Sequence, residues 1–160
     1  MRVAIITISS SRAADGGPDE SGDALDEFAR ALGGEIVARE IVSDERPAIE
    51  QRLRHLSDVE ACDLVLTTGG TGVAPRDVTP EATRAVIERE VPGIAEAMRQ
   101  ASSAHTTNWL LSRGVAGIRG ATLIINFPGN PRSIAQTTSA IEPSLPHALA
   151  LIAGTPTAHR

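Results

Sequence analysis

The chain has 160 residues, a formal net charge of −5 at pH 7, 41% hydrophobic residues and 22% charged residues, which is the composition of one ordinary globular domain. The acidic balance argues against a nucleic-acid or membrane-surface partner, and the absence of Tyr, with one Trp and two Phe, argues against a base-stacking surface. All 15 basic residues are Arg, so mechanisms that need a lysine, such as a Schiff base or a lysyl-adenylate, are excluded.

The single cysteine, Cys62, excludes an intramolecular disulfide and a cysteine-based zinc site, and it fits a reduced cytoplasmic setting. The apolar run from Val3 to Ile8 is too short for a signal peptide, and no stretch approaches the length of a membrane span. We therefore expect a cytoplasmic protein with one domain over residues 1–153 and a flexible C-terminal tail at 154–160.

The first quarter of the chain predicts strands that alternate with helices. Val3 to Ile8 is a continuous β-branched run typical of a central strand, and a polar loop is expected from Ala13 to Glu20. The first helix is expected to begin near Ser21, which suits a helix cap. Glu35 to Val42 predicts a second strand, and Asp44 is expected to open the next helix.

The stretch from Cys62 to Thr83, which reads CDLVLTTGGTGVAPRDVTPEAT, contains a strand, a glycine-rich loop and a helix start. The apolar run from Leu64 to Leu66 is typical of a strand that is buried on both faces in a parallel sheet. Thr79 suits the N-cap of the following helix, and Pro80 suits its first position.

The loop between this strand and this helix is a candidate phosphate site. Its glycines allow backbone N–H groups to approach a phosphate closely, and ligands usually bind at strand-to-helix loops of α/β sheets. A Walker loop is excluded because it needs a lysine, and the dinucleotide fingerprint lacks its third glycine. The alternative is a tight turn that only requires a positive φ at Gly70 or Gly72. The neighbouring carboxylate of Asp77 favours magnesium-dependent phosphate chemistry.

The second half of the chain predicts two helices, an irregular stretch and a hairpin. The helices are expected from Pro80 to about Arg89 and from Gly93 to about Ser102, and His105 to Arg113 shows no clear period. Val115 to Ile118 and Thr122 to Phe127 are expected to pair as antiparallel strands, because an Arg-Gly turn separates them.

A second strand-to-helix loop, from Phe127 to Pro131, repeats the glycine and proline pattern of the first. Asn130 is predicted both to cap the helix that begins at Pro131 and to contact a ligand. The segment from Leu145 to Ile152 supplies a last apolar helix face. These elements together predict a three-layer α/β/α sandwich around a mostly parallel sheet with one antiparallel strand.

The segments TTGGTG and RDVTPEAT resemble the signature of the molybdenum-cofactor biosynthesis proteins of the MogA/MoaB group, the molybdopterin adenylyltransferases and their relatives. The resemblance extends over nearly the whole chain. Further matching segments are Asp19–Gly22 (D-x-S-G), Glu90–Arg99 (E-x-P-G-x-x-E-x-M-R), Ser112–Arg113 and Pro128–Pro131. One departure is that many members carry an Asp shortly after the first strand, where this chain has Ser10 or Ser11.

The resemblance implies a molybdopterin-binding-like fold and an adenylyltransferase, in which the terminal phosphate of molybdopterin attacks the α-phosphorus of ATP and pyrophosphate is released. It also implies Mg²⁺, a homo-trimer, and hand-over of the product to a molybdate-inserting protein. We expect Asp44 and Asp77 to be the catalytic carboxylates and to share the magnesium, because the strands before them are expected to be neighbours. Arg113 is expected to contact a substrate phosphate or a partner chain's carboxylate. The residues expected to bind substrate or nucleotide are Ser9, Ser21, Thr68, Gly69, Gly70, Thr71, Gly72, Arg76, Ser112, Arg113, Pro128, Gly129 and Asn130.

Two alternatives stay open. A non-catalytic trimer of the same family would hold molybdopterin without adenylating it. A metal-dependent nucleotide pyrophosphatase is the other, since the competence-damage proteins share the fold. The loop of those proteins usually carries an acidic pair where this chain has Arg76-Asp77, which disfavours the second alternative.

Overall fold

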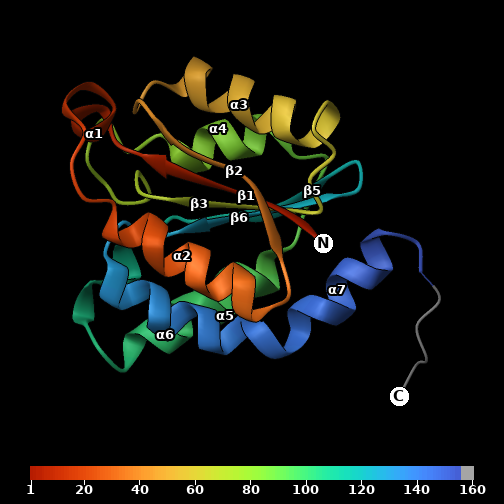
Figure 1. Cartoon of the computed structure of the whole chain (residues 1–160). Helices are drawn as coiled ribbons and strands as arrows, with labels where there is room; N and C mark the ends of the chain where they lie inside the picture. The colour runs from red at the N-terminus through yellow and green to blue at the C-terminus, as the bar shows by residue number, and fades with distance from the viewer. Residues whose placement is uncertain (156–160) are drawn as a thin grey trace.

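The computed structural model describes residues 1–155, and residues 156–160, which belong to the predicted tail, lie outside the described part. The strands form one six-stranded sheet in the order β2-β1-β3-β6-β5-β4 (Figure 1). β5 is antiparallel to both of its neighbours, and the other neighbouring pairs are parallel. The strands are β1 (Arg2–Ile8), β2 (Glu35–Val42), β3 (Leu64–Thr68), β4 (Arg89–Glu90), β5 (Ala116–Arg119) and β6 (Thr122–Phe127).

Helices cover both faces of the sheet (Figure 1). The α-helices are α1 (Ser10–Asp15), α2 (Glu20–Ala31), α3 (Arg46–Asp58), α4 (Thr79–Val86), α5 (Pro92–Ser103), α6 (Pro131–Ile141) and α7 (Leu145–Ile152), and the 3-10 helices are η1 (Thr107–Leu111) and η2 (Glu142–Ser144). α3 and α4 pack on one face, whereas α2, α5, α6 and α7 pack on the other. The predicted three-layer sandwich with one antiparallel strand is therefore confirmed.

The continuous apolar strands are explained by burial on both faces. In β1, Val3 and Ile5 face the layer of α2 and α6, while Ala4 and Ile6 face the layer of α3 and α4. All four side chains are fully buried. Successive side chains of a strand point to opposite faces, so a strand between two helix layers needs apolar residues at every position.

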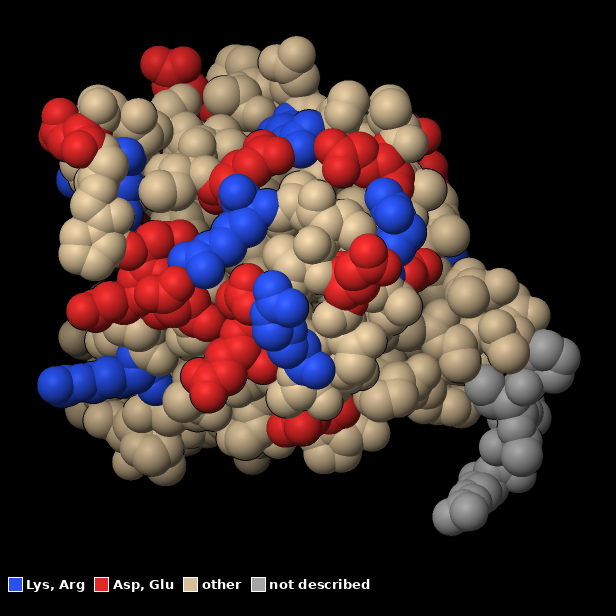
Figure 2. Space-filling view, in the orientation of Figure 1, with Lys and Arg blue, Asp and Glu red and all other residues tan. Residues whose placement is uncertain are grey.

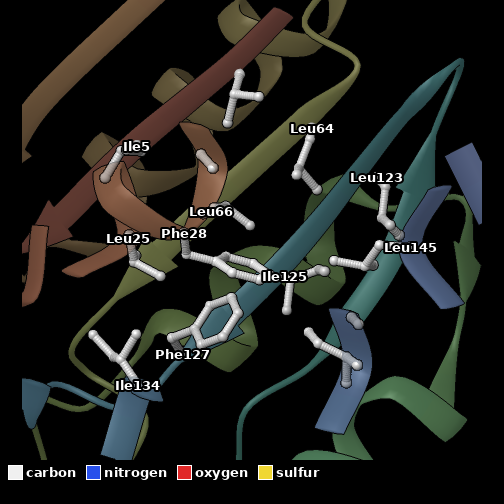
Figure 3. Close-up of a cluster of buried hydrophobic side chains, with 14 of the residues drawn as sticks. Ile5, Leu25, Phe28, Leu64, Leu66, Leu123, Ile125, Phe127, Ile134 and Leu145 are labelled. Atoms are coloured by element: carbon white, nitrogen blue, oxygen red, sulfur yellow. The ribbon is translucent and has the colours of Figure 1, made fainter. Parts of the chain in front are cut away.

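Two phenylalanines supply the only aromatic contact found among residues 1–155. Figure 3 shows Phe28 from α2 and Phe127 from β6 inside the cluster that also contains Leu25 and Ile125. Their ring centroids lie 6.3 Å apart in an edge-to-face arrangement. The rest of this core is aliphatic, as the scarcity of aromatic residues requires.

The first loop is shorter than predicted, because Ser10 to Asp15 form α1. Ser9 caps this helix and accepts a hydrogen bond from the Arg12 N–H at 3.4 Å. α2 begins at Glu20, and its cap is Asp19, which accepts from the Gly22 N–H at 3.1 Å. The interpretation of Ser21 as a helix cap is therefore wrong.

Two further helix starts differ from the sequence prediction. α3 begins at Arg46 with Glu45 in the cap position, so Asp44 does not cap it. α4 begins at Thr79 with Val78 in the cap position, and the Thr79 hydroxyl instead donates to the Gly69 carbonyl at 2.9 Å.

α4 also ends earlier than predicted. Its last residue is Val86, because Arg89 and Glu90 pair with β5 as the edge strand β4.

Basic and acidic side chains lie side by side on the face shown in Figure 2. Arg39 contacts Asp23 at 2.6 Å and Asp19 at 3.4 Å, and Arg52 contacts Glu60 at 2.9 Å. This face therefore carries no unbroken basic stripe of the kind that binds nucleic acid. No helix within residues 1–155 has the length and apolar character that a membrane span requires.

A buried amide connects the sheet to α4. Asn126 in β6 is 2% exposed, and its Nδ2 donates to the hydroxyls of Thr67 at 3.0 Å and Thr83 at 2.9 Å. Its Oδ1 accepts from the Val115 N–H at 3.2 Å. Every polar atom of this side chain thus has a partner, which is the condition for burying an amide without a large cost.

We expect Asn126→Ala to lower the free energy of unfolding by about 2–4 kcal/mol, because it opens a cavity and leaves the Val115 N–H without its acceptor. Urea denaturation followed by circular dichroism measures the change. The matched control is Asn108→Ala, at an exposed position, which is expected to change the same quantity by less than about 0.5 kcal/mol. Equal unfolding free energies for the two variants would contradict the importance of this network.

Candidate active site

A pocket of about 360 Å³ opens where the adjacent parallel strands β3 and β6 end. Two strand-to-helix loops and the end of η1 contribute its walls. The lining residues are Gly70, Thr71, Gly72, Asp77, Asn108, Leu111, Ser112, Pro128, Gly129 and Asn130. The structure thus brings together eight of the residues that were predicted from the sequence, seven from the two glycine-containing loops and Ser112 from the end of η1. We call this cavity the loop pocket.

The two loops that form the loop pocket are joined by hydrogen bonds. The Gly69 N–H donates to the Phe127 carbonyl at 3.2 Å, and the Thr68 hydroxyl donates to the Pro128 carbonyl at 2.8 Å. Because this hydroxyl is buried and already bonded, Thr68 positions the second loop and does not offer its hydroxyl to a ligand. Gly129 packs against Gly69, so a Cβ there would lie 3.4 Å from the Gly69 Cα.

The three glycines of the first loop have different roles. Gly69 and Gly70 have φ values of +99° and +66°, which are favourable only for glycine. A Cβ on Gly69 would lie 2.5 Å from the Ile8 carbonyl oxygen, and a Cβ on Gly70 would collide with Thr79 Oγ1. Gly72 has no positive φ, but a Cβ there would lie 2.8 Å from Asp77 Oδ2. The turn therefore depends on Gly69 and Gly70, and the position of the Asp77 carboxylate depends on Gly72.

Asp77 is half-buried at the edge of the loop pocket. Its Oδ2 accepts a hydrogen bond from the Ala74 N–H at 2.9 Å, and within residues 1–155 no protein donor is bonded to Oδ1. One carboxylate oxygen is thus fixed by the loop, and the other is available to a ligand.

Asp44 lies on the same edge of the sheet but farther along it. The expectation that the strands before Asp44 and Asp77 are neighbours is wrong, since β1 lies between β2 and β3. Asp44 Oδ2 accepts from the Ser10 N–H at 3.1 Å, and the Asp44 N–H donates to Ser10 Oγ at 2.9 Å. Asp44 does not line the loop pocket.

Neither carboxylate belongs to a ready-made metal cage. Among residues 1–155 there is no group of three or more His, Cys, Asp or Glu side chains that is arranged to hold a metal ion. Magnesium is nevertheless often held by one or two carboxylates, several waters and the substrate phosphates. The free oxygen of Asp77 beside the loop fits that mode of binding.

Six predicted binding residues lie outside the walls of the loop pocket, namely Thr68 and Gly69, which are described above, and Ser9, Ser21, Arg76 and Arg113. Ser9 caps α1, and Ser21 is 2% exposed with its hydroxyl directed to Asp19 Oδ1 at 3.4 Å. Arg76 is exposed on the loop. Arg113 turns its guanidinium to the carbonyls of Gly72 and Asp77 and to the carboxylate of Glu81.

A second, larger pocket of about 400 Å³ adjoins the loop pocket, and the two share Asn108, Ser112, Pro128 and Asn130. We call it the helix pocket. Its remaining lining residues are Met98, Arg99, Ser102, His105, Thr106, Trp109, Arg132, Ser133, Gln136 and Thr137.

The sequence analysis missed these helix-pocket residues, because they come from α5, η1 and α6 and form no continuous motif. The available signal was the spacing of Ser133, Gln136 and Thr137, which places three polar side chains on one helix face.

The chain is similar to known proteins in sequence and in structure. Residues 4–147 match the family described as "Probable molybdopterin binding domain". A molybdopterin adenylyltransferase of Helicobacter pylori strain J99 is 50% identical over 115 residues, which are 72% of this chain and 65% of that protein. The match to this relative thus spans less than two thirds of its length.

Two longer matches agree with this one. The molybdopterin adenylyltransferase of Escherichia coli K12 is 44% identical over 146 residues, which are 89% of this chain and 74% of that protein. The crystal structure of the molybdopterin biosynthesis enzyme MoaB from Thermus thermophilus has a TM-score of 0.90 and 48% identity, and the match covers 97% of this chain and 98% of that one.

We expect Gly70→Ala to lower mainly the stability of the protein and Gly72→Ala to lower mainly its affinity for ligand. A Cβ at Gly70 is strained by the positive φ and by Thr79, so the melting temperature falls, with a loss of about 1 kcal/mol or more. A Cβ at Gly72 displaces the Asp77 carboxylate, so the affinity for magnesium-bound ATP falls by more than the stability does. A thermal melt and a calorimetric titration of each variant measure the two effects. Undiminished ATP affinity in Gly72→Ala, together with a lowered melting temperature, would exclude a phosphate-binding role for this loop.

Proposed function

Since this chain belongs to the molybdopterin-binding domain family, as its resemblance to the MogA/MoaB group indicated, we propose that it is a molybdopterin adenylyltransferase. It transfers AMP from ATP to the terminal phosphate of molybdopterin in the biosynthesis of the molybdenum cofactor. The observation that carries the proposal is the loop pocket, in which Gly70 to Gly72 and Asp77 face Gly129 and Asn130.

In this reaction a terminal phosphate oxygen of molybdopterin forms a bond to the α-phosphorus of ATP. The bond from that phosphorus to the oxygen that bridges to the β-phosphorus breaks, and pyrophosphate leaves with the electron pair. The step needs no protein nucleophile, which suits a chain without lysine. It requires instead that two anions are held in line by groups that offset their charge.

Backbone N–H groups of the first loop supply part of that offset. The loop pocket is lined by the backbone of Gly70, Thr71 and Gly72, and successive loop amides form an anion-binding concavity. The second loop adds the N-terminus of α6, where Asn130 Oδ1 accepts from the Arg132 N–H at 3.0 Å. The positive end of a helix dipole favours a phosphate at this place.

Asp77 is the carboxylate that we propose to hold Mg²⁺, through its free Oδ1, and we propose Asp44 as the second carboxylate on the same edge. When bound, the cation offsets negative charge on the phosphate oxygens. Within the chain, the Ala74 N–H fixes the other oxygen of Asp77, so that the side chain is oriented before substrate arrives.

The helix pocket suits the pterin of molybdopterin. Its walls carry the amides of Asn108 and Gln136 and the hydroxyl of Ser133, which can pair with the donors and acceptors of a pterin ring. Because the helix pocket shares Asn108, Ser112, Pro128 and Asn130 with the loop pocket, a ring bound in it would lie beside phosphates bound in the loop pocket. This assignment gives the ring and the phosphates of one substrate separate, adjoining positions.

The proposal extends to the setting of the reaction. We propose a homo-trimer in the cytoplasm that passes adenylated molybdopterin to a molybdate-inserting protein. The trimer, the cytoplasmic location and the hand-over are proposed from the family resemblance.

The experiment that tests the function is incubation of the purified protein with molybdopterin, ATP and Mg²⁺, with detection of adenylated molybdopterin and pyrophosphate. Binding of molybdopterin without either product identifies a non-catalytic member of the family. Pyrophosphate released from a nucleotide without molybdopterin identifies a pyrophosphatase instead.

Asp77→Ala is expected to abolish adenylyl transfer while the fold survives. The residue lies on a loop outside both core clusters, so the melting temperature changes little, whereas the loss of a magnesium ligand raises the barrier by several kcal/mol, about tenfold in rate for each 1.4 kcal/mol. Steady-state kinetics and a thermal melt of the same sample measure both effects. Turnover at the wild-type rate would show that the role given to Asp77 is wrong.

Asp44→Asn is expected to leave the melting temperature unchanged, because the amide oxygen still accepts from the Ser10 N–H. As a ligand it loses its charge, so we expect a raised magnesium requirement and reduced turnover. A titration of the rate with Mg²⁺ measures this. Kinetics equal to wild type at limiting magnesium would leave Asp44 as a structural partner of Ser10 only.

A further inference from the structure

Arg113 contacts the first loop from behind the loop pocket. Its backbone N–H donates to the Thr71 carbonyl at 2.9 Å, its Nε to the Gly72 carbonyl at 2.7 Å, and its Nη2 to the Asp77 carbonyl at 2.6 Å. The same guanidinium pairs with both carboxylate oxygens of Glu81. Arg113 lines neither the loop pocket nor the helix pocket.

These contacts determine which way the loop's peptide groups point. In a trans peptide the C=O and the following N–H point in opposite directions. The carbonyls of Thr71, Gly72 and Asp77 turn toward Arg113, so the N–H groups of Gly72, Val73 and Val78 turn away from it. Of these three residues only Gly72 lines the loop pocket, whereas Arg113 does not, so the Gly72 N–H is the group directed to the side from which a ligand approaches. The contacts of the guanidinium with the Gly72 and Asp77 carbonyls hold the loop on either side of the segment between these residues.

We propose that Arg113 is a positioning residue that holds the first loop in the conformation that presents the Gly72 N–H to substrate phosphate. This inference rests on the proposed function and assigns Arg113 a different role from the phosphate contact that the family resemblance implied. The guanidinium acts on the substrate through the loop backbone.

The planar fork of arginine is essential to this role. Nε and the two Nη groups donate in fixed directions to two carbonyls and one carboxylate at once, whereas the three donors of a lysine ammonium share one nitrogen and cannot reproduce this spread-out geometry. Glu81, in the first turn of α4, fixes the orientation of the fork. The hydrogen bond from Arg113 lowers the pKa of the Glu81 carboxyl below its ordinary value, which is the mark of a favourable ion pair.

Arg119 provides a matched control elsewhere in the fold. Its Nε and Nη2 pair with the two oxygens of Asp58 at 2.8 and 2.6 Å, and its Nη1 donates to the Val86 carbonyl at 3.0 Å. It therefore also connects a carboxylate to a carbonyl of α4, but at the opposite end of that helix from Glu81. Arg119 lines neither pocket.

The experiment compares Arg113→Lys, Arg119→Lys and the charge-swapped double variant Arg113→Glu/Glu81→Arg with wild type. Hydrogen exchange of the ligand-free proteins, read on a peptide that covers residues 69–79, reports the loop without any substrate. Titration with magnesium pyrophosphate reports anion binding, and steady-state kinetics with molybdopterin and ATP report turnover.

We expect Arg113→Lys to accelerate exchange in the loop, weaken pyrophosphate binding and lower kcat by roughly 10- to 100-fold, which is the scale for a displaced binding group. Arg119→Lys should leave all three at wild-type values. In the charge-swapped variant, loop exchange, pyrophosphate binding and kcat should not return to wild-type values, because a glutamate side chain at position 113 donates to no carbonyl.

Loop exchange in Arg113→Lys that equals wild type, or full recovery in the charge-swapped variant, overturns the inference. Absence of adenylyl transfer in wild type overturns the proposed function alone, since faster loop exchange and weaker pyrophosphate binding in Arg113→Lys still support the positioning role.

Discussion

The burial of three neighbouring parallel strands on both faces is the constraint on which the rest of this structure depends. β1, β3 and β6 have almost no exposed side chain, so a polar ligand has no access to either face of the sheet at its centre. The backbone groups that end the strands are the first polar groups that remain accessible, and ligands of open α/β sheets bind there for this reason. The position of the loop pocket is therefore a consequence of how the core is covered.

The register of β3 against β6 then determines how the pocket is assembled. Thr68 pairs with Phe127, so the two strands end at the same level and their loops start side by side. Two hydrogen bonds join the loops directly after this pair, from Gly69 to Phe127 and from Thr68 to Pro128. A shift of one residue in this register would separate the loops and expose apolar side chains. Core packing and the geometry of the site thus have the same origin.

The features that could be predicted from the sequence are those that depend on the pattern of residues within a short segment. Five of the six strands, the fold class and the role of Asn130 as a cap follow from apolar periodicity and turn chemistry, and they agree with the structure, whereas the edge strand β4 was not predicted. The prediction that Asp44 and Asp77 follow neighbouring strands was wrong, because β1 lies between β2 and β3. Strand order is a property of the whole sheet, and the order of the strands along the chain does not reveal it.

Thr79 differed from prediction for a related reason, and the contacts of Arg113 could not be foreseen for the same reason. A polar or charged side chain in or beside a loop has several partners within reach, and the partner that it finds depends on tertiary contacts. The Thr79 hydroxyl donates to the Gly69 carbonyl, and Arg113 donates to the carbonyls of the first loop.

The absence of lysine also bears on the site, because the loop pocket, as formed by residues 1–155, is lined by no basic side chain. Arg113 is engaged with the loop carbonyls, so in the proposed reaction phosphate charge would be offset by backbone N–H groups, a helix dipole and the proposed metal ion. The backbone groups and the helix dipole are fixed before a substrate arrives, and preorganised groups of this kind would favour the proposed transfer between two anions.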